Sequence, residues 1–389
     1  MLKFPKLFFH SDSDTDTFES RILPDTQQRS YLQSCVRKIK NHLKPRISLA
    51  TKAILGMERS VTPRFRTQGS WSYDTCVVPA MTPPQEMDWD YGVYLPVTVW
   101  EENGPPHEMA KAYFDLVEQL LEELCDEEKW TLLPGKDTCI RIQVASWAHI
   151  DVPLYAAPEE EFEKITESVS LAKASAFDSA SMESFDFAEA LETQQQWEDL
   201  DSVVMAMRTG EWKPSDPKVV ANWFNDRVEE HGAQLRRVCR YLKAWRDHHW
   251  QKGGPTSVSI MIAVAQAFEP RHGRDDHSLE EAARHLSRAF LGEIREPGID
   301  EGAEDFNRLQ DADRKEAAQR FGQLAAQIFQ ARQSALHEKE AVVAQLRQQF
   351  GNRLPMDCER VEPDSGPDAI RNTPASRVVA PVIPSTKAG

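Results

Sequence analysis

The sequence lacks the features that disulfide-rich, zinc-stabilised and membrane-spanning proteins require. None of its six cysteines forms a CxxC pair, so we expect reduced thiols rather than a disulfide or zinc framework. The longest apolar run, near Val258–Phe268, is too short to span a bilayer and predicts a buried helix. The first residues are broken by Pro5 and make a poor secretory signal. Together these features predict a cytoplasmic protein that contacts no membrane.

Positive charge is also scarce. The 389 residues include 46 Lys and Arg against 62 Asp and Glu, a formal net charge of −16. Proteins that grip long nucleic acids usually have the opposite balance, so we expect no broad binding of duplex DNA. A basic pocket for a small phosphate ligand remains compatible with this total. The 40% hydrophobic content suffices for one large core or two smaller ones, and a monomer is our default expectation.

The first half of the chain predicts a mixed α/β domain. Residues 26–57 and 107–124 carry apolar side chains three and four positions apart, which is typical of helices. Residues 89–95 and 140–144 alternate with a period of two, as strands do, and residues 148–156 read as a third strand. No internal repeat is present.

The second half predicts helices. Residues 157–210 are acidic and rich in Ser and Ala, typical of surface segments, and the helical pattern begins at Asp216-Pro217, a cap followed by proline. A long helix is expected from about Asp313 to Phe350. We therefore predict a core domain over residues 1–215 including an N-terminal helix and the acidic insert, a helical domain over 216–355, and a disordered tail over 356–389.

Two aspartates dominate the functional reading. Asp88 and Asp90 lie two positions apart in a predicted strand, so they point to the same side and repel each other. A hard divalent cation removes this conflict, and Mg²⁺ is typically held by one or two carboxylates plus substrate phosphates. Asp151 sits in another predicted strand, between Ile150 and Val152. If the two strands are neighbours, three carboxylates can hold two metal ions for phosphoryl transfer.

A Gly-Ser pair, Gly69-Ser70, precedes this strand by about twenty residues. Glycine lets the backbone approach a ligand closely, and backbone N–H groups with a serine hydroxyl can hold phosphate oxygens. The pair alone is uninformative, because almost every protein contains one. Its position before a D-x-D strand gives it weight.

Each of these features also has an ordinary interpretation. An i, i+2 aspartate pair is usually a solvated strand face, and Asp151 would commonly be a surface residue of an edge strand. Arg236, Arg240 and Lys243, on the opposite side of a predicted helix from its apolar residues, would usually be an exposed basic face. One metal-dependent site for phosphoryl transfer accounts for all of these features together with the Gly-Ser pair, so we favour it.

The arrangement GS…DxD…D resembles the nucleotidyltransferase superfamily with its polymerase-β-like fold. Longer blocks resemble one branch of it, the CD-NTase family of bacterial anti-phage signalling enzymes, and within that family the cyclic GMP-AMP synthases. The matching blocks run in order from about residue 60 to residue 355: PRFRTQGSWSYDT, QEMDWDYGVYLP, HIDVPLYA, SDPKVVANWFND, LRRVCRYLKAWRD, GGPTSVS and FGNR. The resemblance implies an α/β (α+β) fold with a mixed sheet, a C-terminal helical domain, and an active site in the cleft between them.

The resemblance also implies roles for individual residues. Asp88, Asp90 and Asp151 take the catalytic, metal-ligand positions, with two Mg²⁺ ions or Mn²⁺ in their place. The nucleotide-binding positions are Gln68, Gly69 and Ser70 for the donor triphosphate, Tyr73 for stacking on a purine, Arg141 for the acceptor nucleotide, and Lys243 and Ser257 for phosphates. Arg66 stands where a close relative has tryptophan, so the resemblance does not decide whether a regulatory pocket lies beside the active site.

The expected activity is synthesis of 3′,3′-cyclic GMP-AMP from ATP and GTP, as a second messenger in anti-phage (CBASS) defence. No DNA activator is expected, because the chain lacks the His/Cys zinc insert of eukaryotic DNA-sensing relatives. The effector would meet the product rather than the enzyme. Alternatives are another cyclic di- or trinucleotide such as cyclic di-AMP or cyclic tri-AMP, oligoadenylate, template-independent RNA synthesis, or a non-catalytic nucleotide-binding scaffold.

The final residues, Lys387-Ala388-Gly389, suggest a further partner. A flexible tail that ends in glycine is a substrate for enzymes of the ubiquitin-activating and ubiquitin-conjugating type, and some relatives are joined to other proteins in this way. The alternative is an idle end.

Overall fold

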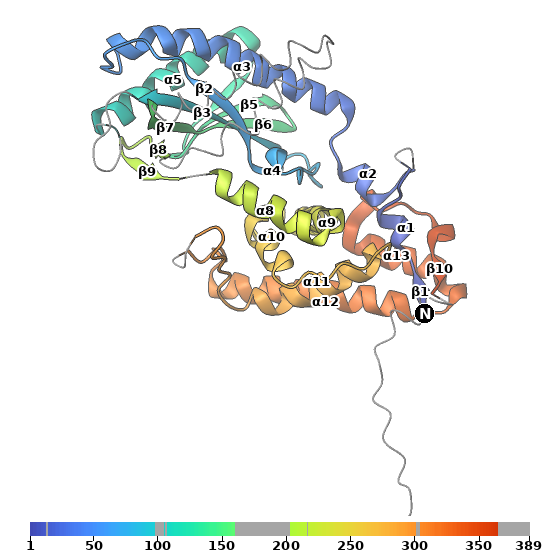
Figure 1. Ribbon diagram of the computed structural model, residues 1–389. Helices are drawn as coiled ribbons and strands as arrows, with labels where there is room; N and C mark the ends of the chain where they lie inside the picture. The colour runs from blue at the N-terminus through green and yellow to red at the C-terminus, as the bar shows by residue number, and fades with distance from the viewer. Residues whose placement is uncertain are drawn as a thin grey trace, which may run out of the picture.

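The computed structural model describes residues 1–12, 15–97, 105, 107–159, 203–215, 217–300 and 304–364. It confirms a mixed α/β unit followed by a helical unit (Figure 1). The elements of the first unit are α3 (Thr26–Ala53), β2 (Arg64–Gln68), α4 (Gly69–Ser72), β3 (Met87–Val97), α5 (His107–Glu128), β4 (Thr131–Leu133), β5 (Ile140–Ala145), β6 (Ala148–Val152), β7 (Leu154–Pro158), β8 (Val204–Ala206) and β9 (Trp212–Pro214).

The sheet has the order β4-β5-β6-β3-β7-β8-β9, with β2 also paired to β3. Strand β3 is central: its first half runs parallel to β6 and its second half parallel to β7, while β2 is antiparallel to it. Helices α3 and α5 cover one face (Figure 1) and pack a buried core against it. The single strand predicted over 148–156 is therefore wrong. It is two strands separated at Pro153, which has no N–H for a continuous ladder.

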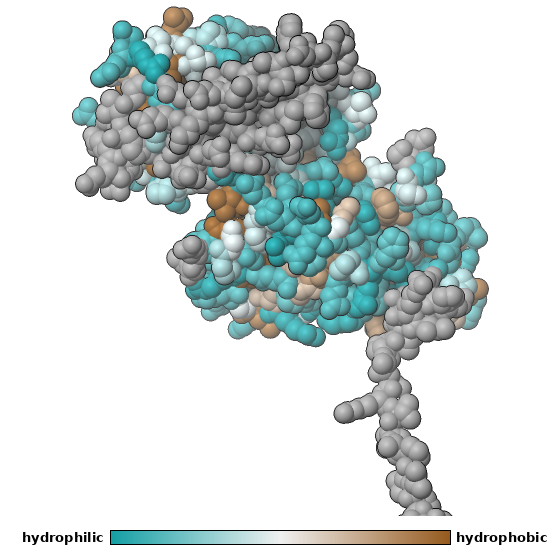
Figure 2. All heavy atoms as spheres, viewed as in Figure 1, coloured by the Kyte–Doolittle hydropathy of each residue, from teal (hydrophilic) through white to brown (hydrophobic). Residues whose placement is uncertain are grey.

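The helical unit contains α8 (Pro217–His231), α9 (Ala233–His249), α10 (Ser257–Ala265), α11 (Asp275–Ala289), α12 (Asp311–Gln333) and α13 (Lys339–Phe350). The single helix predicted over 313–350 is wrong, because the chain leaves helical geometry at Ser334 and turns through a short 3₁₀ segment, Leu336–Glu338. Helix α9 is the centre of this unit and is buried along most of its length. The face of the unit visible in Figure 2 is mainly hydrophilic.

The N-terminal residues belong to the helical unit and not to the α/β core, which corrects the predicted boundary at residue 1. Strand β1 (Leu2–Lys3) lies against α12, helix α1 (Pro5–Phe8) against α11, and helix α2 (Phe18–Ile22) against α9. Phe8 and Phe18 are fully buried and contact Tyr241 of α9 and Phe350 of α13. Burial of these aromatic rings is a large apolar contribution to the helical core.

The disorder predicted from residue 356 does not begin there. Residues Cys358–Arg360 form a 3₁₀ turn, Val361 is fully buried, and β10 (Glu362–Pro363) pairs with β1. Arg274 Nη1 forms an ion pair with Asp364 Oδ2 at 2.8 Å inside the helical unit. Gly389 and the conjugation predicted for it lie outside the described residues, as do most of the acidic insert and Asp216.

The two units meet along a defined set of hydrogen bonds. Gln85, just before β3, donates to the carbonyl oxygens of Asp247 and Trp250 at 2.7 and 2.8 Å. Arg353, in the 3₁₀ turn Gly351–Arg353, donates to Val78 of the first unit at 2.9 Å. These contacts place the end of α9 directly opposite the start of β3.

Candidate functional site

Three carboxylates meet at the start of β3. Strand β6 runs parallel to β3 with Asp90 opposite Asp151 and Asp88 opposite His149. Side chains two positions apart on one strand share a face, so Asp88, Asp90 and Asp151 face the same space. The sequence pattern predicted this convergence, and the pairing of β3 with β6 supplies the neighbouring strand it required.

Asp151 is almost completely buried and is held by two cations. Lys136 Nζ lies 2.6 Å from its Oδ2, and Arg141 Nε lies 2.6 Å from its Oδ1. Burial alone would raise the pKa of Asp151, but the hydrogen bonds and charges of Arg141 and Lys136 hold it below its usual range. Asp151 is therefore ionised at neutral pH, the form in which a carboxylate can bind a metal ion.

Asp90 is in the opposite electrostatic situation. Burial, followed by the negative charges of Asp88 and Asp151, raises the pKa of Asp90 to about 7. A carboxylate cluster with this property is short of positive charge, which a divalent cation would supply.

The Gly-Ser turn touches the carboxylate cluster directly. Gly69 has a φ of +59°, and a Cβ added there would lie 2.1 Å from Asp90 Oδ2. Only glycine fits this combination of left-handed backbone and close approach. Trp71 of α4 fixes the turn to the strand, because its indole donates to the carbonyl oxygen of Asp88 at 3.0 Å and its ring stacks on Trp89.

His149 is a site residue that the sequence reasoning missed. Its Nδ1 lies 2.9 Å from Glu86 Oε2, and its Nε2 lies 3.0 Å from Asp88 Oδ1. Burial would lower the pKa of His149, but the hydrogen bond and charge of Asp88 raise it. The signal was present in the alternation of His149 with Asp151, which places both on one face of β6.

The donor set fits a divalent cation. One ligand atom from each of Asp88, His149 and Asp151 lies within 4.8 Å of the others, and Asp90 is paired directly with Asp151 in the strand register. Carboxylate oxygens are the ligands that Mg²⁺ and Mn²⁺ prefer.

A cleft of about 480 Å³ opens from this cluster toward the helical unit. Several predicted nucleotide-binding residues line it: Gly69, Ser70, Tyr73, Lys243 and Ser257, together with Asp88 and Asp90. Arg246 and Lys252 add positive charge from the helical side. The cleft thus has carboxylates on one wall and cations on the other, an arrangement suited to a metal-bound polyphosphate.

Two of the predicted phosphate ligands are engaged by protein groups in this structure. Lys243 is buried and donates to the carbonyl oxygen of Thr75 at 2.5 Å, and its burial lowers its pKa to about 8. Ser257, the first residue of α10, accepts a hydrogen bond from Arg246 Nη1 at 3.0 Å.

The side chains of three predicted nucleotide-binding residues are engaged by other protein groups. Gln68 is buried and does not line the cleft. Its Nε2 donates a hydrogen bond to the Tyr94 hydroxyl at 2.6 Å, and its Oε1 accepts one from the Tyr155 hydroxyl at 3.2 Å. Arg141 is engaged by Asp151. Tyr73 lines the cleft, but its ring is 6% exposed and packs edge-on against Phe224. Roles for these residues in contacting nucleotides stay predictions.

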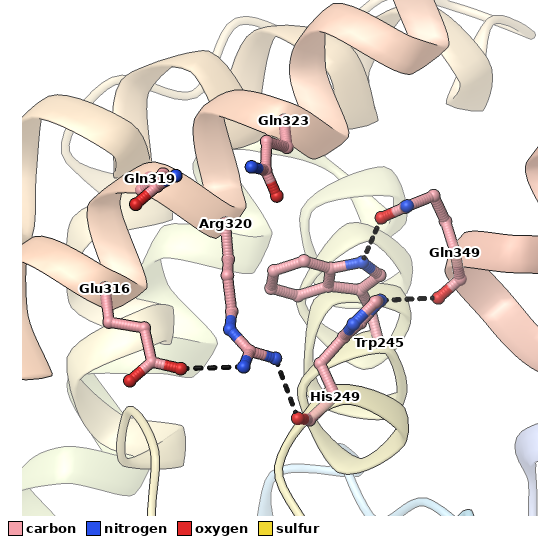
Figure 3. Close-up of a pocket in the computed structure, with 7 residues that line it drawn as sticks. All are labelled: Trp245, His249, Glu316, Gln319, Arg320, Gln323 and Gln349. Atoms are coloured by element: carbon pink, nitrogen blue, oxygen red, sulfur yellow. Dashed lines mark hydrogen bonds and ion pairs between the residues drawn. The ribbon is translucent and has the colours of Figure 1, made fainter.

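A second, smaller cavity of about 320 Å³ lies within the helical unit, behind the end of α9 (Figure 3). Arg320 of α12 reaches across it to donate to the carbonyl oxygen of His249 at 2.9 Å, and its guanidinium covers the Trp250 ring at 4.6 Å. Trp250 also lines the larger cleft beside the carboxylates. Arg320 therefore supports one wall of that cleft from behind.

Among the described residues, no helix is both long and apolar enough to cross a bilayer.

Comparison with known proteins gives the same pattern in both units. Residues 63–155 match the family model described as the DncV-like cyclic GMP-AMP synthase nucleotidyltransferase domain, and residues 232–362 match the cyclic GMP-AMP synthase C-terminal domain. A cyclic GMP-AMP synthase of Vibrio cholerae is 38% identical over 248 residues, 61% of this chain and 55% of the relative. One from Escherichia coli is 39% identical over 248 residues, covering 60% and 55%. In sequence, the match thus spans about half the length of these curated relatives.

Solved structures extend the similarity over nearly the whole chain. The crystal structure of Vibrio cholerae DncV, a cyclic AMP-GMP synthase, has a TM-score of 0.72 at 25% identity and covers 93% of this chain and 99% of its own. A complex of that enzyme with ATP and GTP gives a TM-score of 0.75 at 25% identity, with coverages of 92% and 98%. With both domain models matched in order and the fold shared throughout, the chain belongs to the family of DncV-like nucleotidyltransferases.

Proposed function

We propose that this protein is a bacterial cyclic dinucleotide synthase that makes 3′,3′-cyclic GMP-AMP from ATP and GTP. The observation that carries the proposal is the convergence of Asp88, Asp90 and Asp151 beside one cleft. Ser70 lines this cleft on the side of the carboxylates, and Lys243 lines it on the side of the helical unit. The related Vibrio cholerae enzyme has been captured with a linear pppApG intermediate, which supports a two-step route.

In the first step, the 3′-hydroxyl of one nucleotide attacks the α-phosphorus of the other. A bond forms between the ribose oxygen and phosphorus, the bond to the β-phosphate oxygen breaks, and pyrophosphate leaves while the hydroxyl proton passes to solvent. A second transfer of the same kind closes the ring. Two Mg²⁺ ions, when bound, would lower the pKa of the attacking hydroxyl and neutralise charge on the leaving oxygen.

The chain's own residues bind and orient. Asp151, ionised through Arg141 and Lys136, and Asp88 and Asp90 on the adjacent strand would hold the ions. Gly69 lets the turn approach the carboxylates, which brings the Ser70 hydroxyl to the triphosphate. Positioning and charge stabilisation of this kind account for most of the rate enhancement in phosphoryl transfer, so a strong general base is not required.

Cellular roles follow as part of the proposal. The product would act as a second messenger in anti-phage defence, read by an effector that does not contact the synthase. We do not expect DNA to activate the enzyme, because the net charge of −16 disfavours duplex binding.

The test is product identification by mass spectrometry after incubation with Mg²⁺ and the four ribonucleoside triphosphates, together and in labelled pairs. We expect one cyclic dinucleotide containing one AMP and one GMP, formed only when both ATP and GTP are present. Asp115→Asn serves as a matched control to Asp88→Asn, because Asp115 is exposed, lies outside the cleft and forms an ion pair with Lys111 in its own helix. The product should be lost in Asp88→Asn and retained in Asp115→Asn. A different cyclic product would overturn the assigned bases. Retention of the product in Asp88→Asn would overturn the assigned site.

A further inference from the structure

Three cationic side chains of α9 hold three consecutive carbonyl oxygens of the loop that follows the Gly-Ser turn. Arg236 Nε donates to Tyr73 O at 3.1 Å, Arg240 Nε donates to Asp74 O at 2.9 Å, and Lys243 Nζ donates to Thr75 O at 2.5 Å. The donors are spaced four and three residues apart, so they form one row along the helix. We call residues 73–75 the tethered loop.

The tethered loop is bonded to the Gly-Ser turn itself. The N–H of Thr75 donates to Ser70 O at 2.8 Å. Within the turn, the Ser72 hydroxyl donates to Gly69 O at 2.8 Å. Ser70 and Gly69 belong to the α/β unit, whereas the three cations belong to the helical unit. The Gly-Ser turn is therefore held from across the cleft as well as by Trp71 within its own unit.

Arg240 is the centre of this row. Its Nη2 donates to Asp74 O at 2.7 Å and lies 2.6 Å from Asp74 Oδ2, and its Nη1 donates to Glu19 Oε1 at 2.7 Å. The Arg240 side chain is buried, so removing any one of these partners would leave part of its positive charge without a hydrogen-bond acceptor, which costs free energy. Asp74 has a φ of +55°, a left-handed backbone that costs free energy unless contacts hold it.

We propose that Arg240, supported by Arg236, is a positioning residue for the nucleotide site. It fixes the tethered loop, and through Thr75 the Gly-Ser turn, at the distance from α9 that lets Ser70 and Lys243 act on one polyphosphate. This inference rests on the proposed function, and it assigns Arg240 no contact with substrate.

Arg237 provides a matched control on the same helix. It is also held by a buried carboxylate, Asp275, at 2.7 and 2.9 Å, but all its described contacts lie within the helical unit. Arg237→Gln and Arg240→Gln therefore each remove a guanidinium from a buried ion pair on α9, and only the second releases the tethered loop.

Two readouts test the proposal. Amide hydrogen exchange of the full chain without nucleotide should accelerate about tenfold or more at residues 70–76 in Arg240→Gln and stay unchanged there in Arg237→Gln. The KM for ATP and GTP should rise about tenfold in Arg240→Gln relative to Arg237→Gln, with a smaller change in kcat. Arg240→Lys, which keeps the charge and one carbonyl contact, should recover part of both losses.

Equal exchange at residues 70–76 in the two glutamine variants would overturn the inference. Because exchange is measured without nucleotide, that result differs from failure of the proposed function, in which the unaltered protein makes no cyclic product. If Arg240→Gln does not fold, Arg236→Gln, which loses the Tyr73 carbonyl contact from a partly exposed position, is measured against the same control with the same criteria.

Discussion

Replacing Gly69 with alanine should lower activity about 100-fold, while its loss of stability should be close to that of an alanine at any other left-handed glycine. At φ +59° an alanine costs about 1–2 kcal/mol in backbone strain. Its Cβ would also stand 2.1 Å from Asp90 Oδ2, far inside contact distance, so either the Gly-Ser turn or the carboxylate must move. A displacement of about 1 Å at a reacting centre costs about 100-fold in rate.

Gly56 is the control for the backbone term. Its φ is +67°, and no described atom lies within 4 Å of an added Cβ. Both variants should lose a similar free energy of unfolding in urea, while only Gly69→Ala should lose about 100-fold in turnover of ATP and GTP. If Gly69→Ala keeps the turnover of Gly56→Ala, the contact between the turn and Asp90 has no catalytic role and the reasoning is refuted.

Two other predictions concern α9 and the N-terminal segment. Burial lowers the pKa of Lys243 from 10.5 to about 8, so its charge is lost as pH rises through 8 and the KM for nucleotides should rise above that pH. Lys243→Arg should remove this rise, because arginine stays charged. Identical KM profiles in both proteins would refute the assignment of Lys243 as a phosphate ligand. Between pH 8 and 10.5 the unfolded chain binds more protons at this lysine, so its contribution should make stability increase over that range. Phe8→Ala should cost about 3–5 kcal/mol of unfolding free energy, because Phe8 is fully buried. Phe329 is half-exposed, so Phe329→Ala should cost far less. Equal urea midpoints of the two variants would contradict the placement of the N-terminal segment in the helical core.

The sequence predicted the carboxylate site because its signal is local. Asp88 and Asp90 alternate with buried residues in one strand, and Asp151 does so in another, so the period of two fixes the face of each. Their convergence needed only the pairing of β3 with β6. The alternation of His149 with Asp151 places both on one face, but it identifies His149 as a site residue only once the register places it opposite Asp88.

The environment of α9 could not be predicted in the same way. Its amphipathic pattern suggested an exposed basic face, yet Arg240 and Lys243 are buried. Their charges are satisfied by carbonyl oxygens of a loop more than 160 residues away, together with Glu19. Periodicity identifies apolar faces, but it does not show which polar face will meet backbone acceptors from another domain.

The boundaries were misplaced for a related reason. Phe4, Leu7 and Phe8 lie in a segment too short to show a helical period, and Val361 lies among prolines and charged residues. Both segments are ordered by long-range packing and by the pairing of β1 with β10. Order of that origin leaves little trace in local sequence.

The most direct test of the central claim is product formation by Asp88→Asn/Asp90→Asn with ATP, GTP and Mg²⁺. The double variant keeps the size of both side chains and removes two of the three negative charges, so its fold should persist in circular dichroism while the cyclic product disappears. Unchanged product formation by the folded double variant would contradict the account, because the paired carboxylates would then have no part in the chemistry.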